Sequence, residues 1–176
     1  WIEEATKRGL YNYKSTPDVL PAFLADKNRK LFNDHGVYSD GELESRYEIK
    51  VETYCKTLHI EARTLVDMLI HDVLPSISKY TDSIADSIIK RRQVSDIPTE
   101  ADELRMRKLV VGYETLSKLC DKLKEEIKVA DATADLLAQA KYYHDNILAL
   151  MDDIRMLSDK IEEEMPKEFI SYPTYA

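Results

Sequence analysis

The chain has 176 residues, of which 33 are acidic and 25 are basic, so its formal net charge at pH 7 is −8. A chain of this length can bury a core of its own, and its negative charge argues against a general affinity for nucleic acid phosphates. Only four glycines and six prolines occur and 44% of the residues are hydrophobic, which excludes a disordered tail, a collagen-like chain and a turn-rich β protein. We therefore expect an all-α fold.

The sequence also bears on the location of the protein. No apolar run approaches the roughly 18 residues that a membrane span requires, and the N-terminus lacks the basic and apolar regions of a signal peptide. We expect a cytoplasmic protein without membrane contact. Cys55 and Cys120 could pair in a disulfide, but they lack the spacing of metal ligands and are predicted to be reduced core residues. Because the chain starts at Trp1 and stops at Ala176, we expect it to be part of a longer polypeptide.

The first segment, residues 1–38, is predicted to form short helices. Gly9 and Gly36 are placed where glycine commonly ends a helix. Thr16 is expected to cap a further short helix, with Pro17 at its first position. This segment is therefore a lead-in rather than part of a helical bundle.

A long helix is predicted to follow over about residues 40–94. Ser39 and Glu42 have the spacing of a capping box at its start. Apolar positions then recur at steps of four or three residues: Tyr47, Val51, Tyr54, Leu58, Ala62, Leu65, Leu69 and Val73. This sustained period outweighs the short alternation at residues 47–51 that would suit a strand. Pro75 is expected to kink the helix rather than end it, since no polar loop follows.

Two further long helices are predicted, over about residues 99–129 and 132–165. Thr99 is expected to cap the second helix, and Gly112 in its interior indicates a close contact between helices. The third carries apolar residues at coiled-coil-like steps of four and three: Leu136, Ala140, Tyr143, Ile147, Leu150, Ile154, Leu157 and Ile161. Three long helices joined by tight turns predict an up-down-up bundle at 39–165, followed by an extended aromatic tail at 166–176.

The candidate chemistry is sparse. The four scattered glycines cannot form a phosphate-binding loop or a dinucleotide fingerprint. Two pairs, His59 with Glu61 and His71 with Asp67, could serve as acid/base or metal pairs, but pairing on the surface of a helix is favoured. A ferritin-like site would require inward Glu-x-x-His pairs, and none occurs. No catalytic residue and no metal-binding residue is assigned.

One long stretch carries a resemblance. LESRYEIKVETYCKTLHIEARTLVDM, followed by DVLPSISKYT, resembles the C-terminal region of type III glutamine synthetases, the large bacterial branch of that superfamily. The flanking segments WIEEATKRGLYNYKSTPDVLPAF and KLFNDHGVYSDGELESRYEI resemble the part of that family that precedes this region, and YPTYA resembles the start of its terminal motif. The resemblance runs almost from end to end, and the second helix is its least distinctive part.

The resemblance implies an enzyme in which ATP phosphorylates glutamate and ammonia displaces the phosphate, with magnesium or manganese neutralising the phosphates. It places the catalytic carboxylates and arginines before the region matched here. The chain would then be a helical C-terminal domain, inert alone and accessory to the catalytic domain of a parent polypeptide that forms homo-oligomeric rings. The alternative is an independent helical module that binds a partner protein.

Six residues are candidates for contacts between domains or subunits, because a bundle core does not explain their polarity or position. They are Arg46, Glu48, Lys56, Glu61, Tyr172 and Tyr175. Two of them also have partners one turn away on the same helix, Arg46 with Glu42 and Lys56 with Glu52, in the favourable acid-first order. The cluster of Arg46, Glu48, Lys56, His59 and Glu61 is therefore predicted to be structural rather than catalytic.

Overall fold

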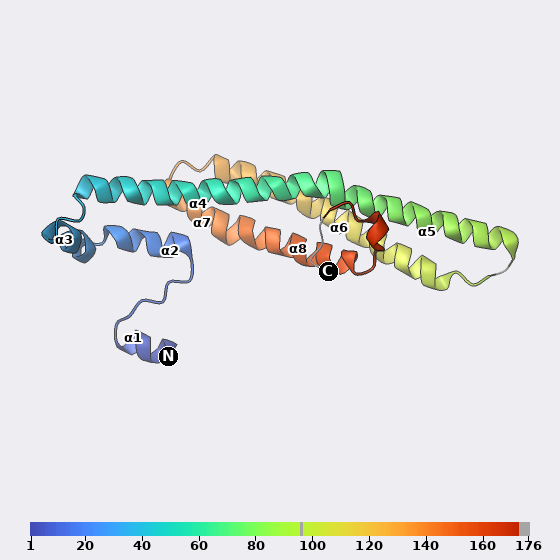
Figure 1. The fold of residues 1–176 in the computed structure, drawn as a ribbon, viewed down its shortest axis with the longest axis horizontal. Helices are drawn as coiled ribbons and strands as arrows, with labels where there is room; N and C mark the ends of the chain where they lie inside the picture. Colours follow the sequence, from blue (N-terminus) through green and yellow to red (C-terminus); the bar gives the residue numbers. More distant parts are fainter. Residues whose placement is uncertain (96, 173–176) are drawn as a thin grey trace. The chain divides into compact units, whose positions relative to one another are not determined.

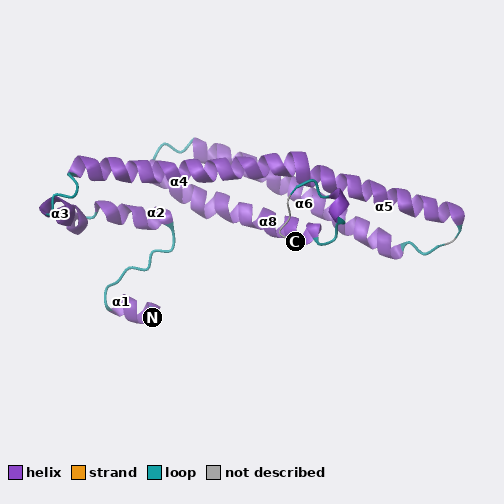
Figure 2. Cartoon of the chain, viewed as in Figure 1, coloured by secondary structure: helices purple, strands orange, loops and turns teal. Residues whose placement is uncertain are grey.

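The computed structural model describes residues 1–95 and 97–172. Figures 1 and 2 show helices joined by loops, and no strand occurs in these two ranges. The prediction of an all-α fold is confirmed. The chain divides into two compact units. Unit 1 comprises Trp1–Ile60 and Val129–Asn146, and unit 2 comprises Glu61–Lys128 and Ile147–Ala176. The expected division into residues 1–38, 39–165 and 166–176 stays a prediction.

Unit 1 begins with short helices, as predicted. They are α1 (Ile2–Lys7), α2 (Thr16–Val19), the 3-10 helix η1 (Leu20–Leu24) and α3 (Asp26–Asp34). Gly9 and Gly36 follow the first and last of these with φ angles of 72° and 60°, the left-handed conformation that glycine adopts without strain. The helix ends expected at both glycines are confirmed.

The cap of α2 differs from the prediction. Ser15, not Thr16, is the N-cap, and its Oγ accepts a hydrogen bond of 3.3 Å from the Asp18 N–H. Thr16 is the first helical residue, which places Pro17 at the second position. Both hydroxyl residues can cap a helix, and the hydroxyl that reaches a free N–H of the first turn decides between them.

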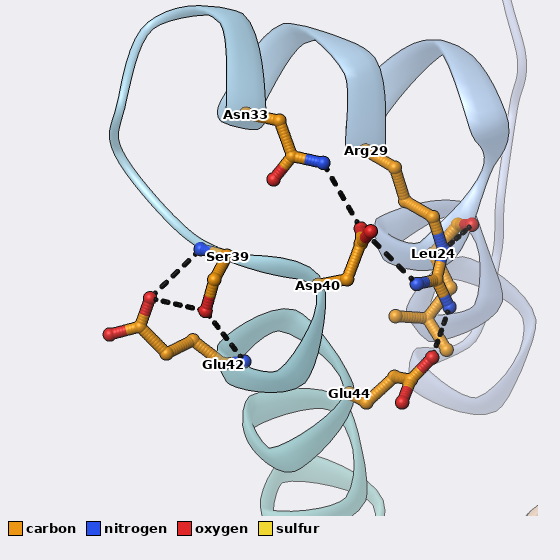
Figure 3. Close-up of polar contacts among 7 residues, drawn as sticks. All are labelled: Leu24, Arg29, Asn33, Ser39, Asp40, Glu42 and Glu44. Carbon is orange, nitrogen blue, oxygen red and sulfur yellow. Dashed lines mark hydrogen bonds and ion pairs between the residues drawn. The ribbon is translucent and has the colours of Figure 1, made fainter.

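The predicted capping box starts α4 (Asp40–Met68), as Figure 3 shows. The Ser39 N–H and hydroxyl donate to the Glu42 carboxylate at 2.8 and 2.9 Å, and the Glu42 N–H donates to Ser39 Oγ at 3.4 Å. Hydrogen bonds from the backbone and side chain of Ser39 lower the pKa of Glu42. The capping box is confirmed.

Arg29 fixes α3 against the start of α4 (Figure 3). Its Nε donates to the Leu24 carbonyl at 2.9 Å, and its two terminal nitrogens contact Glu44 at 3.0 Å and Asp40 at 3.5 Å. Asn33 also donates to Asp40, at 3.1 Å. A planar guanidinium can make these contacts at once because its five donors point in fixed directions.

Unit 2 contains the rest of α4, the π-helical turn η2 (Leu69–Val73), α5 (Leu74–Val94), most of α6 (Glu100–Asp131) and α8 (Ala149–Glu162). The helical backbone continues past Pro75 to Val94, as predicted. The kink expected at Pro75 stays a prediction, but the π-helical turn η2 lies just before this residue. A proline removes a ladder hydrogen bond and crowds the carbonyl four residues earlier, here that of His71, which belongs to η2.

Contacts within unit 2 define an up-down-up order of helices. Beside the turn after α5, ion pairs join Arg91 to Asp102 and Arg92 to Glu103, so α5 and α6 are antiparallel. Two further observations show that α6 and α8 are antiparallel. Lys108 binds Glu164 at 2.9 Å, and a Cβ added at Gly112 would lie 2.6 Å from Ile161 Cδ1. The close helix contact predicted at Gly112 is confirmed.

The third long helix differs from the continuous segment predicted at 132–165. It starts at α7 (Leu136–Tyr142), passes through the π-helical turn η3 (Tyr143–Leu148) and ends with α8. Asp135 caps α7 by accepting from the Ala138 N–H at 2.7 Å. Since aspartate is a strong N-cap, the first turn forms after residue 135 rather than at 132. The preceding helix, predicted to end near 129, extends to Asp131.

Apolar side chains fill the cores of both units, and many positions of the predicted stripes are among them. The core of unit 1 includes Leu43, Val51, Cys55, Leu58, Ala130, Ala140 and Tyr143. The core of unit 2 includes Ala62, Leu69, Val73, Ile77, Tyr80, Ile84, Ile88, Leu109, Leu116, Cys120, Leu123, Ile127, Leu150, Ile154 and Ile161. Cys55 and Cys120 are buried and free, as expected. Across residues 1–95 and 97–172, no helix has the length and apolar character needed to cross a membrane.

The beginning of the aromatic tail packs on α5 within unit 2. A short 3-10 helix, η4 (Lys167–Phe169), places the Phe169 ring 5.0 Å from the ring of Tyr80. Two residues later, the Ser171 hydroxyl lies 3.2 Å from the hydroxyl of Ser76. These contacts lead the chain to Tyr172, which lines a groove described below.

Candidate functional site

A groove of about 380 Å³ in unit 2 collects two of the residues predicted to make contacts, Glu61 and Tyr172. We call it the Tyr172 groove. Its walls come from the second half of α4, from η2, and from the end of η3 and α8. The lining residues are Glu61, Leu65, Met68, Leu69, Val73, Leu148, Met151, Asp152, Arg155, Ser158, Asp159, Glu162 and Tyr172.

The groove combines an apolar floor with a negatively charged rim. Leucine, valine and methionine side chains from both walls form the floor. Four carboxylates, Glu61, Asp152, Asp159 and Glu162, line the rim against the single guanidinium of Arg155. Such a groove suits an apolar group that carries a positive charge, since the floor removes the apolar part from water and the rim attracts the cation.

Tyr172 lines the Tyr172 groove from the segment that follows η4. Burial, a hydrogen bond to the Glu162 carboxylate and the charges of Glu162 and Asp159 all raise the pKa of its hydroxyl. The phenol therefore stays protonated at neutral pH and can donate to a carboxylate beside it. Tyr175, the last of the predicted contact residues, lies outside the described residues.

The other three predicted contact residues belong to unit 1. The Arg46 guanidinium lies 4.6 Å from the centre of the Tyr38 ring, a cation–π arrangement. Lys56 binds Glu52 at 2.6 Å, the predicted pairing of residues one turn apart. Glu48 is exposed on α4. The structure thus brings together Glu61 and Tyr172 and leaves the remaining three on their own unit.

A further polar cluster of unit 1 joins His59, Asp131 and Tyr143, and we call it the His59 cluster. His59 Nδ1 lies 2.9 Å from the Tyr143 hydroxyl and 3.2 Å from Asp131 Oδ1, and the hydroxyl donates to the same Oδ1 at 3.1 Å. Because the tyrosine proton points to Asp131, Nδ1 of a neutral His59 must carry the other proton. In that tautomer, Nε2 is the nitrogen without a proton.

The His59 cluster adjoins a second cavity, of about 350 Å³, whose lining includes Cys55 and Lys56. Tyr143 is 1% exposed, and burial, with the Asp131 charge next, raises the pKa of its hydroxyl. Burial also raises the pKa of the Cys55 thiol. Both groups are therefore protonated at neutral pH. The arrangement can join the end of α6 to α4 and η3, and neither its phenol nor the neighbouring thiol is ionised.

The histidine pairs considered from the sequence have different outcomes. The structure pairs His59 with Asp131 and Tyr143 rather than with Glu61, which lines the Tyr172 groove instead. Tyr143 lies on the predicted apolar stripe and its ring is buried, but the spacing of apolar residues carries no signal for its hydroxyl. His71 and Asp67 form an exposed pair at 3.0 Å, the surface interpretation favoured above. Within the described ranges, no group of three or more His, Cys, Asp or Glu is placed to hold a metal ion.

The comparisons with known proteins agree with the resemblance. Residues 1–92 match the family model described as "Glutamine synthetase C-terminal domain". The chain is 36% identical over 176 residues to a glutamine synthetase of Butyrivibrio fibrisolvens, a match that covers 99% of this chain. It is 30% identical over 181 residues to the type-3 glutamine synthetase of Dictyostelium discoideum, covering 100% of this chain.

A third relative, a glutamine synthetase of Bacteroides fragilis, is 23% identical over 180 residues. Each match spans 25% of the relative's own length, so the chain corresponds to about a quarter of these proteins. The match of the family model over more than half of the chain, together with near-complete coverage by these relatives, shows that this chain belongs to the glutamine synthetase C-terminal domain family.

Proposed function

We propose that the chain is the helical C-terminal domain of a glutamate–ammonia ligase and that it is accessory to a catalytic domain elsewhere in the same polypeptide. The observation that carries the proposal is the end-to-end match to relatives named as glutamine synthetases, of which the chain spans 25%. The parent enzyme would use ATP with magnesium or manganese, act in the cytoplasm and assemble into homo-oligomeric rings, as the resemblance implies.

Two surfaces are proposed to contact the rest of the parent enzyme. The first is the Tyr172 groove, whose apolar floor and four carboxylates suit a segment with an apolar side chain next to a lysine or arginine. The second is the exposed face of α4 that carries Arg46 and Lys56, together with Glu48, which is exposed on another side of the same helix. Arg46 makes a cation–π contact with Tyr38, and Lys56 pairs with Glu52.

The first experiment measures phosphate release from ATP that depends on both glutamate and ammonia. It compares the parent enzyme, the 176-residue chain alone, and the parent without this region. We expect activity in the parent only. Activity in the isolated chain would contradict the accessory role, because the chemistry would then lie in these residues. Full activity and unchanged oligomer size in the truncated parent would instead favour the independent interaction module.

A second experiment tests the Tyr172 groove within the parent enzyme. Glu61→Lys reverses a rim charge, so we expect it to lower the activity or the oligomer size of the parent. Asp82→Lys is the matched control, because Asp82 is exposed on α5 of the same unit and does not line the groove. Equal effects of the two substitutions would mean that the rim charge makes no specific contact. Arg46→Ala and Lys56→Ala test the α4 face with the same measurements.

A further inference from the structure

A second groove in unit 2 has the opposite charge. It has a volume of about 530 Å³ and lies between α6 and α8 around Gly112. We call it the Gly112 groove. Its lining residues are Arg107, Lys108, Leu109, Val111, Gly112, Thr115, Leu157, Lys160, Ile161 and Glu164. Neither the family match nor the proposed accessory role assigns it a purpose.

The floor of the Gly112 groove is apolar and depends on the missing side chain of Gly112. A Cβ at this position would lie 2.6 Å from Ile161 Cδ1 and 3.0 Å from its Cγ1, so only glycine lets α8 approach this closely without moving Ile161. Leu109 and Ile161 are buried, whereas Val111 is 64% exposed although it lines the groove. An apolar side chain left in water beside such a floor is a surface that a ligand can cover.

The rim of the groove is positively charged in a chain whose net charge is negative. Three cations, Arg107, Lys108 and Lys160, face one carboxylate, Glu164. Lys108 is already bound to Glu164 at 2.9 Å. Arg107 and Lys160 therefore supply the positive charge at the rim. Arginine can bind a carboxylate through two parallel hydrogen bonds.

The size of the groove suits a small molecule. Its lining on α6 runs from Arg107 to Thr115, a length of about 12 Å at 1.5 Å per residue. Its volume lies within the roughly 300–1,000 Å³ typical of ligand pockets. We propose that the Gly112 groove binds an aliphatic carboxylate, with the alkyl chain on the floor and the carboxylate beside Arg107 and Lys160. This proposal is independent of the ligase function of the parent.

The test is isothermal titration calorimetry of the 176-residue chain with hexanoate, octanoate and octylammonium, after circular dichroism has shown that the chain is helical. We expect octanoate to bind more tightly than hexanoate, by up to about fourfold for each added methylene that is buried. Octylammonium has the same alkyl chain with the opposite charge, so it should not compete with octanoate.

Variants assign the binding to the Gly112 groove. Arg107→Glu combined with Lys160→Glu should weaken octanoate binding by about tenfold or more, the loss expected when charge-assisted hydrogen bonds are removed. Lys118→Glu combined with Lys122→Glu is the matched control, since both lysines are exposed on α6 outside the groove. Val111→Ser should also weaken binding, because it removes exposed apolar surface without touching the core.

Three results would overturn the proposal. The first is octanoate binding that is equal in the groove variant and the control variant. The second is octylammonium that displaces octanoate. The third is saturable binding of an acidic helical peptide with no binding of octanoate, which would assign the groove to a protein partner instead.

Discussion

Replacing Tyr143 with phenylalanine removes the one hydroxyl that contacts both His59 and Asp131 in the His59 cluster. The ring stays in place, so the apolar burial of a residue that is 1% exposed does not change. What is lost is the bond from the hydroxyl to Asp131 at 3.1 Å and its contact with His59 at 2.9 Å. The substitution therefore isolates the polar contribution of one side chain.

The expected loss of stability depends on whether His59 and Asp131 keep a polar partner after the substitution. A hydrogen bond contributes about 0.5–1.5 kcal/mol net, and about 1.5–3 kcal/mol where one partner is charged. His59 Nδ1 and Asp131 Oδ1 lie 3.2 Å apart and remain paired after the substitution. Neither partner is then left buried without a contact, so we expect a loss of about 1–1.5 kcal/mol, at the lower end of the combined range.

The assay is urea unfolding followed by far-UV circular dichroism, with Tyr113→Phe as the control because Tyr113 is 37% exposed. Tyr143→Ala should cost about 3–5 kcal/mol, since it also removes the buried ring. A double-mutant cycle of Tyr143→Phe with Asp131→Asn should give a coupling energy of at least about 0.5 kcal/mol. A Tyr143→Phe loss no larger than that of Tyr113→Phe, or a coupling energy near zero, would refute the reasoning.

Three further predictions concern single side chains. Ser39→Ala should lower stability by about 1 kcal/mol through loss of the N-cap and return the pKa of Glu42 toward its ordinary value, which a carboxyl NMR titration would detect or contradict. Tyr172 has a folded-state pKa above its unfolded value of about 10, so stability should fall as pH rises beyond about 10, and Tyr172→Phe should reduce that fall in alkaline urea melts. Gly112→Ala gains up to about 1 kcal/mol of helix propensity but displaces the Ile161 side chain, and overpacking costs about 1–3 kcal/mol. We therefore expect a net loss in urea unfolding and weaker octanoate binding, and a stabilised variant with unchanged binding would contradict this account.

The long helices could be predicted because their evidence is local and repeated. A stripe that recurs every three or four residues over many turns is incompatible with a strand, and Val51, Leu69, Ile77 and Ile154 are buried as that stripe requires. The capping box at Ser39 was equally local, since its two partners are three residues apart. Features whose physical cause lies within one helical turn could therefore be predicted from the sequence.

The features that escaped prediction depend on competition or on distant partners. Ser15 and Thr16 both have hydroxyls that can cap α2, and Asp135 competes with helix formation at residues 132–134 because its carboxylate accepts from Ala138. The η3 turn interrupts a stripe that has no proline or glycine to mark the place. The spacing of the apolar residues does not distinguish an interior turn of α-helix from an interior turn of π-helix.

The His59 cluster is the clearest example of a missing long-range term. Tyr143 lies on the apolar stripe, and its burial was correctly expected from that position. The hydroxyl at the end of the ring acts with His59, 84 residues earlier in the chain, and with Asp131, 12 residues earlier. The periodicity of one helix predicts which face of that helix is buried. It carries no information about which polar group of another helix will contact a side chain on that face.

The two grooves of unit 2 show a similar limit for charge. A net charge of −8 describes a chain that should repel anions on average, yet α8 contributes to grooves of both signs. Its residues Asp152, Arg155, Ser158, Asp159 and Glu162 line the Tyr172 groove, and Leu157, Lys160 and Ile161 line the Gly112 groove. Asp159 and Lys160 are adjacent in sequence, but consecutive residues of a helix point about 100° apart, so the two charges reach different surfaces. Because exposed charges are largely screened beyond about 10 Å, a ligand in either groove responds to the charges of that rim rather than to the total.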